Sequence, residues 1–158
     1  MHKIHPFLWF ETEAEEAMNY YCSVFKDAKK GKVTRFPDAV PGMGGKVVTA
    51  EFELFGQRFT ALNGKDASRP FSEAISLYVD CEDQAEVDRY WNALTADGGA
   101  ESMCGWLKDK YGVSWQIIPK ALPRLMSDTD RGKADRVMQA MLQMKKIVVA
   151  DLEKAHAG

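Results

Sequence analysis

The sequence predicts an α+β fold made of two tandem βαβββ units and a helical tail. Three observations support it: an ordinary globular composition, an internal repeat, and alternation of apolar and polar residues in the strand-like segments. The 158 residues are 46% hydrophobic and 28% charged, which suits a single chain long enough to bury a full core. We therefore expect one domain over residues 1–158.

The internal repeat appears when the second half of the chain is aligned on the first. The residues that then coincide are Ile4 with Ile75, Glu11 with Glu82, Tyr20 with Trp91, Phe55 with Tyr111, Phe59 with Trp115 and Leu62 with Ile118. The later pairs need a different offset because the second half lacks much of the segment 37–45. Self-similarity of this kind indicates duplication of one strand-helix-strand-strand-strand unit.

In the first unit, the helix is predicted to begin with Thr12 as its N-cap, since Glu15 stands at the capping-box spacing. The segment 37–45 has two prolines and several glycines, which is typical of a loop. Gly56-Gln57 is predicted as a hairpin turn. The predicted elements are strand 3–10, helix 12–25, and strands 33–36, 47–55 and 58–62.

The elements of the second unit and of the tail are predicted from the same patterns of apolar spacing and capping residues. A stripe of methionines at helical spacing, Met138, Met141 and Met144, favours a core or dimer seam in the tail, and Asp130 or Thr129 caps that helix. The predicted elements are strand 74–81, helix 82–96, strands 104–107 and 113–118, and helices from 130 onward. The modules are placed at residues 1–66 and 67–120, with C-terminal helices over 121–158.

Each unit has one helix for one small sheet, so one sheet face is covered and the other is open. Alternation places Ile75, Leu77 and Val79 under the helix and Ser76 and Tyr78 on the opposite face. The side chains predicted to share the corresponding open face of the first unit are His5, Phe7 and Trp9. Two open faces of this kind predict a cupped cavity with aromatic walls, which suits a small-molecule ligand.

Composition excludes several other classes of protein. The net charge of -2 and the absence of a basic stripe argue against nucleic-acid binding. No apolar run approaches the roughly 20 residues that span a bilayer, and the N-terminus lacks a signal-peptide pattern, so we expect a cytoplasmic protein. The three cysteines show no CxxC spacing and are expected to be free thiols.

Several runs carry a resemblance to a known family. They are PFLWF at 6–10, the helix start AEEA at 14–17, EFELFGQRF at 51–59 and CGWLKDKYGVSWQ at 104–116. In these runs, and over nearly the whole chain, the sequence resembles the PhnB-like branch of the vicinal oxygen chelate (glyoxalase/bleomycin resistance/dioxygenase) superfamily. The resemblance implies a cupped mixed sheet, a small-molecule ligand and a homodimer.

The resemblance also implies a divalent metal held by the first and last strands of the two halves. The positions that match are His5, Thr60, Ser76 and Gln116. Only His5 is a strong ligand and Gln116 a weak one, so the set is incomplete for a catalytic metal. His5 is the candidate catalytic residue; the candidate ligand-binding residues are Phe7, Trp9, Thr60, Ser76, Tyr78 and Gln116. Glu51 is a further carboxylate whose face the sequence leaves open.

Three functions follow from these expectations. The first is binding of a small molecule in the cavity, without catalysis. The alternative is a metal-dependent lyase or isomerase of the glyoxalase type, acting through His5. The third is the 3-demethylubiquinone methyltransferase activity named in the family label. It is disfavoured because the one dense glycine cluster, Gly42–Gly45, follows no long strand and opens no helix.

Overall fold

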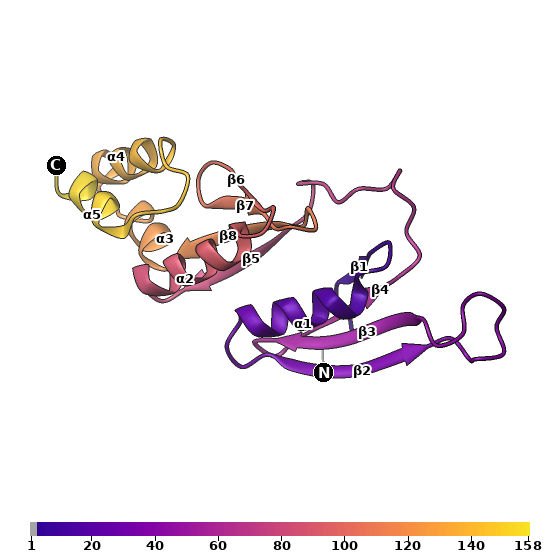
Figure 1. Cartoon of the computed structure of the whole chain (residues 1–158). Coiled ribbons are helices and arrows are strands. Elements are labelled where there is room, and N and C mark those ends of the chain that lie inside the picture. Colours follow the sequence, from indigo (N-terminus) through magenta and orange to yellow (C-terminus); the bar gives the residue numbers. More distant parts are fainter. Residues whose placement is uncertain (1–2) are drawn as a thin grey trace. The chain divides into compact units, whose positions relative to one another are not determined.

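The computed structural model describes residues 3–158 and divides the chain into two compact units, Met1–Arg69 and Pro70–Gly158 (Figure 1). Each unit holds one four-stranded sheet, and its elements follow the order strand, helix, strand, strand, strand. The predicted fold class, two tandem βαβββ modules with a helical C-terminal extension, is confirmed. The assignment of residues 1–158 to one glyoxalase-like domain stays a prediction.

The first unit has the strand order β1-β4-β3-β2, with β1 parallel to β4 and the other pairs antiparallel. Two predicted strands differ in their bounds by more than one residue. β1 is shorter than 3–10, and β2 begins earlier than residue 33 because the Lys29-Lys30 segment pairs with β3. The elements are β1 (Phe7–Trp9), α1 (Ala14–Val24), β2 (Lys29–Arg35), β3 (Val47–Leu54) and β4 (Gln57–Leu62).

Helix α1 covers one face of this sheet. Its buried side includes Ala14, Ala17, Met18 and Tyr21, as the apolar spacing predicts. The ring of Tyr21 stacks on Phe52 of β3 at 5.8 Å between centroids, and Phe52 stacks on Phe59 at 5.2 Å. Burial of such rings and small residues supplies most of the stabilisation of the unit.

The start of α1 differs from the prediction. The N-cap is Glu13, and Thr12 makes no side-chain cap. Instead, the amide side-chain oxygen of Asn63 accepts a hydrogen bond of 2.8 Å from the backbone N–H of Ala14. Asn63 follows β4, so the cap comes from a distant part of the chain, which local sequence spacing does not reveal. The hairpin turn is also shifted by one residue: Phe55 and Gly56 have φ of 48° and 79°, as a two-residue type I′ turn requires.

The second unit has the strand order β5-β8-β7-β6, again with its first strand parallel to its last. Strand β6 was not predicted, because two residues carry no periodicity, and β7 begins two residues later than the predicted Cys104 start. Ile75 precedes β5 and is 78% exposed, so its predicted place under the helix is wrong, whereas Val79 is buried. The elements are β5 (Ser76–Cys81), α2 (Gln84–Thr95), β6 (Ala100–Glu101), β7 (Trp106–Lys108) and β8 (Ser114–Pro119).

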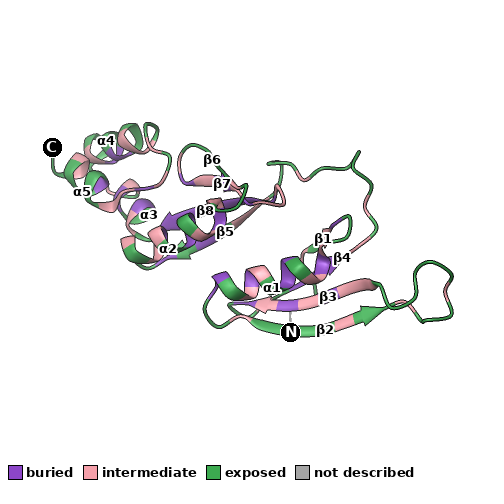
Figure 2. Ribbon diagram, in the orientation of Figure 1, coloured by how far each residue is buried: buried purple, intermediate pink, exposed green. Residues whose placement is uncertain are grey.

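The tail forms α3 (Ala121–Met126), α4 (Arg131–Met141) and α5 (Val149–Ala157), with Asp130 capping α4 as predicted. These helices pack on the end of β8 through a cluster of Ile118, Leu122, Leu125, Val137, Ile147 and Leu152. Met141 and Met144 pack against this cluster, while Met138 is 40% exposed. In Figure 2 the buried residues of the tail lie on the inner sides of its helices and the exposed ones on the outer sides.

The tail is attached to the sheet by backbone and side-chain hydrogen bonds. The backbone N–H groups of Cys104 and Gly105 donate to the carbonyls of Met144 and Lys145 at 2.7 and 2.8 Å. The amide side chain of Gln84, in α2, donates to Ile147 O at 3.0 Å and accepts from Val149 N at 2.7 Å. These contacts make the tail an integral part of the second unit.

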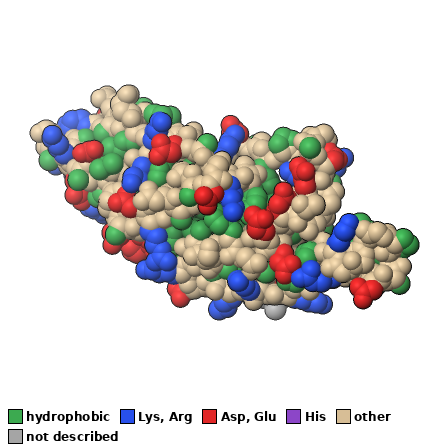
Figure 3. Space-filling view, viewed as in Figure 1, with side chains coloured by type: hydrophobic (Ala, Val, Ile, Leu, Met, Phe, Trp, Pro, Cys, Tyr) green, Lys and Arg blue, Asp and Glu red, His purple; other side chains and the backbone are tan. Residues whose placement is uncertain are grey.

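Lys and Arg side chains are interspersed with Asp and Glu on the face drawn in Figure 3. Among residues 3–158, no helix has the length and apolarity needed to cross a membrane.

Candidate functional site

The open face of the first sheet is defined by alternation along β4. Phe59 and Ala61 are buried under α1, so Arg58, Thr60 and Leu62 face the other way. The parallel register pairs Phe7 with Thr60 and Trp9 with Leu62. The predicted open-face residues of this unit therefore lie on the predicted face.

His5 lies at the edge of this face and contacts two side chains of β4. Its Nε2 is 3.2 Å from the hydroxyl of Thr60, and its Nδ1 is 2.9 Å from Nη2 of Arg58. The same Arg58 nitrogen is 3.2 Å from Nε2 of the ring. A guanidinium group can only donate, and its contacts with the ring are exposed, so they orient His5 without excluding another partner.

Glu51 shares this open face. It is the direct cross-strand partner of Thr60 on β3 and is half-buried. The structure thus settles a question that the sequence left open, because the pairing register fixes which face each side chain occupies.

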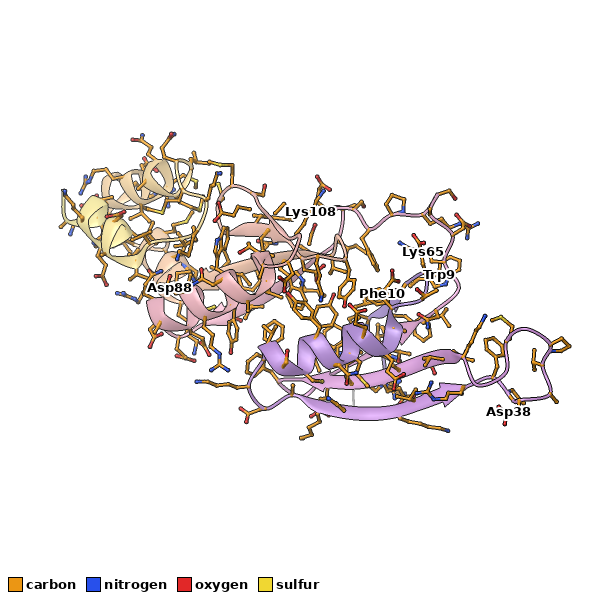
Figure 4. All side chains as sticks on the ribbon, viewed as in Figure 1. Trp9, Phe10, Asp38, Lys65, Asp88 and Lys108 are labelled. Carbon is orange, nitrogen blue, oxygen red and sulfur yellow. The ribbon has the colours of Figure 1, made fainter. Side chains whose placement is uncertain are left out.

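The aromatic residues of β1 are only partly covered. Phe7 is 56% exposed. The guanidinium of Arg69 lies over the Trp9 ring at 5.2 Å from its centroid. Among the described residues, the indole N–H of Trp9 is buried without a hydrogen-bond partner. Trp9, the last residue of β1, and Phe10, which follows it, are labelled in Figure 4.

The open face of the second sheet repeats the arrangement. The amide nitrogen of Gln116 donates to the hydroxyl of Ser76 at 2.8 Å, across the parallel β5–β8 pair. Ser76 occupies the repeat position of His5, and Gln116 that of Thr60, so the two hydrogen bonds are equivalent in the two halves. The structure therefore pairs the four expected ligand positions within each sheet: His5 with Thr60 in the first, and Ser76 with Gln116 in the second.

Across this second face, three side chains lie in one row. Tyr78 is the register partner of Gln116 on one side, and Trp106 is its partner on the other. Tyr78 is 50% exposed, and its pKa is raised by partial burial and by the nearby Asp80 carboxylate, so its hydroxyl stays protonated and can donate at neutral pH.

This row forms the floor of a pocket of about 540 Å³. The walls come from the tail helices, which sequence reasoning did not assign to the site; the methionine stripe was the one available signal. The lining residues are Tyr78, Cys104, Trp106, Gln116, Ile118, Leu122, Pro123, Met126, Ser127 and Met141. A mostly apolar concavity with a few polar groups is typical of a small-molecule site.

A larger cavity of about 830 Å³ lies in the first unit, between α1 and the segment 36–47. It contains none of the predicted site residues, and most of its walls are exposed side chains such as Glu11, Glu16 and Met43. We therefore centre the site on the second sheet.

Within each of the two units, the described residues offer no complete set of strong metal ligands. Within residues 3–158, no group of three or more His, Cys, Asp or Glu side chains is arranged to hold one. His5 is held by Thr60 and by a cationic guanidinium, which opposes a nearby metal charge.

Residues 2–118 match the model of a family described as 3-demethylubiquinone-9 3-methyltransferase. This chain belongs to that PhnB-like family. A PhnB protein from Bacillus cereus, described as a putative 3-demethylubiquinone-9 3-methyltransferase, is 40% identical; the match covers 75% of this chain and 99% of that one, with a TM-score of 0.68. No curated protein matches.

Two more distant structures share the fold of this chain. A glyoxylase/bleomycin resistance protein/dioxygenase domain from Frankia is 14% identical, over 75% of this chain and 92% of that one, with a TM-score of 0.50. A fosfomycin resistance protein, FosX, from Listeria monocytogenes, solved with Mn(II) and sulfate, is 12% identical, over 73% and 88%, with a TM-score of 0.50. At these identities the likeness concerns the fold alone.

Proposed function

We propose that this chain binds a small, largely apolar molecule in the pocket between the open face of β5, β7 and β8 and the tail helices. The observation that carries this proposal is the row of Tyr78, Gln116 and Trp106 beneath an apolar wall. The rings offer area for an aromatic ligand, while the amide and the phenol offer hydrogen bonds that fix its orientation.

A neutral aromatic probe, 2-naphthol, tests this. We expect saturable binding by calorimetry, weakened by about tenfold or more, about 1.4 kcal/mol, when Met141→Trp fills the pocket. Met138→Trp is the matched control, since Met138 lies on the same helix and does not line the pocket. Binding that survives Met141→Trp in a folded variant would place the probe elsewhere and contradict the proposal.

A thiol reagent gives a second readout. Cys104 lines the pocket, whereas Cys22 belongs to the first unit. We expect 2-naphthol to slow the labelling of Cys104 and to leave the labelling of Cys22 unchanged. Equal rates at Cys104 with and without saturating probe would argue against the site.

A metal-dependent lyase or isomerase is the second candidate, favoured by the FosX structure with Mn(II) and by His5 at a first-strand position. The contacts of His5 with Arg58 and Thr60 weigh against it.

We expect no binding of S-adenosylmethionine by calorimetry, which separates both candidates from a methyltransferase.

We further propose that the protein is cytoplasmic and forms a homodimer. Light scattering tests the oligomeric state, and a monomer would contradict the dimer.

A further inference from the structure

Ser114, the first residue of β8, carries a hydroxyl with no evident structural use. The residue is 2% exposed, and among residues 3–158 its Oγ is one of two buried side-chain polar atoms without a hydrogen-bond partner. Burying a hydroxyl without a partner is unfavourable, because its hydrogen bonds to water are not replaced. Ser114 is two residues before Gln116 on β8, so both side chains belong to the open face.

Beside this hydroxyl is a second, smaller cavity of about 150 Å³. Its lining includes Ser114, Lys108, Glu73 and Trp106. Lys108 is the direct cross-strand partner of Ser114, so their side chains start about 5 Å apart on the same face. Lys108 stands on β7 (Figure 4).

The ammonium group of Lys108 already holds a carboxylate. Its Nζ is 2.9 Å from Oε2 of Glu73, whose side chain is 66% exposed and belongs to the irregular segment before β5. The pKa of Glu73 is lowered, chiefly by its hydrogen bond to Lys108, so Glu73 is ionised at neutral pH. An exposed pair of this kind contributes little to stability, so an incoming anion can replace Glu73 at small cost.

The two cavities share a wall. Trp106 lines both the 540 Å³ pocket and the 150 Å³ cavity, which makes them adjoining parts of one open face. A molecule long enough to pass the Trp106 side chain would bring an apolar body against the larger pocket and an anionic end to the smaller cavity.

We propose that the ligand of this site is an aromatic or aliphatic carboxylic acid. Its carboxylate takes the place of Glu73 at Lys108 and accepts a hydrogen bond from Ser114, while its body lies against Trp106 in the larger pocket. This inference rests on the proposed function and names the ligand class. In the unliganded protein the carboxylate of Glu73 occupies the place at Lys108 that the ligand carboxylate takes on binding.

Paired probes test it: 2-naphthoate, 2-naphthol and 2-naphthyl phosphate, each titrated by calorimetry near pH 7. We expect 2-naphthoate to bind about tenfold more tightly than 2-naphthol. Lys108→Met should remove this preference without changing 2-naphthol binding, and Glu73→Gln should strengthen 2-naphthoate binding severalfold. Lys145→Met is the control, since that exposed lysine pairs with Glu101 and neither residue lines either cavity.

Ser114→Ala supplies an independent readout. Removing an unpaired buried hydroxyl should leave the melting temperature of the unliganded protein unchanged or raised, yet weaken 2-naphthoate binding and spare 2-naphthol. A purely structural serine would show the opposite pattern, with lower stability and unchanged preference.

The outcomes separate the two proposals. Equal binding of 2-naphthol and 2-naphthoate overturns the carboxylate inference and leaves the pocket proposal standing. Binding of neither probe overturns both. Tighter binding of 2-naphthyl phosphate than of 2-naphthoate overturns the carboxylate assignment in favour of a larger oxyanion.

Discussion

Nη2 of Arg58 lies 2.9 Å from Nδ1 of His5, while the hydroxyl of Thr60 lies 3.2 Å from Nε2 of the same ring. His5 is therefore held at the edge of the open face by two side chains of β4. The guanidinium weighs against a metal at His5, because a positive charge beside the ring opposes the charge of a bound cation.

The first prediction concerns metals. Because His5 is engaged and its neighbour is cationic, we expect Mn²⁺, Ni²⁺, Zn²⁺ and Mg²⁺ to leave the melting temperature of untagged protein unchanged, by thermal shift. His5→Ala should behave in the same way. A metal-induced rise that His5→Ala abolishes would support the metal-dependent alternative.

The second prediction concerns the joint between the sheet and the tail. Gly105 has φ of +82°, and a Cβ there would lie 2.7 Å from Cδ1 of Ile118 and 3.1 Å from Cγ1 of Ile147. Gly105→Ala should therefore lower the free energy of unfolding by about 2–4 kcal/mol, from backbone strain plus crowding. Urea unfolding measures it.

Gly112→Ala is the matched control for this change. Gly112 has φ of +85° but no atom within 4 Å of an added Cβ, so only the backbone cost of about 1 kcal/mol is expected. Equal losses of unfolding free energy in the two variants would show that crowding against Ile118 and Ile147 does not contribute.

The third prediction concerns the turn before β8. The buried carboxylate of Asp109 accepts hydrogen bonds from Tyr111 N and Trp115 Nε1 at 2.9 Å and from Val113 N at 3.1 Å. Asp109→Ala leaves these donors unpaired and should cost about 3 kcal/mol or more. Asp135→Ala, at an exposed pair with Arg131, should change stability by about 0.5 kcal/mol or less. Similar small losses of unfolding free energy in both variants would show that the hydrogen bonds to Asp109 do not stabilise the turn.

The fourth prediction concerns acid stability. Oδ2 of Asp128 lies 2.7 Å from Nε2 of His156 in α5, and the pKa of Asp128 is lowered, first by the backbone N–H of Asp130 and then by His156. A carboxyl with a lowered folded pKa stabilises the fold above its unfolded pKa of about 3.9, and this contribution is lost as pH falls through the folded value.

Asp128→Ala should therefore be less stable than the parent protein at about pH 6, with the gap closing at about pH 2, by denaturant unfolding. Gln139→Ala, at an exposed and uncharged position of α4, is the control, and its stability relative to the parent protein should stay constant over this range. A gap that stays constant across this range would show that the carboxylate charge plays no part.

The sequence predicted the elements well where periodicity is long. The alternation in 76–81 and the apolar face of 14–24 are patterns that the segment itself carries, and the structure buries most of the residues that they indicate. The sequence prediction failed where the hydrogen-bonding partner of a segment comes from a distant part of the chain. Asn63 replaces Thr12 as the cap of α1, and β6 exists because Ala100 and Glu101 pair with β7.

The site divides in the same way. The sequence by itself determined the duplicated βαβββ plan and the alternation that separates the covered from the open face, because alternation is a property of the strand; His5, Thr60, Ser76 and Gln116 came from the family resemblance. Only the tertiary structure decided that Arg58 engages His5, that the tail walls the pocket, and that Ser114 is left unpaired beside Lys108. These facts depend on registers and packing between segments far apart in the chain, which no local pattern encodes.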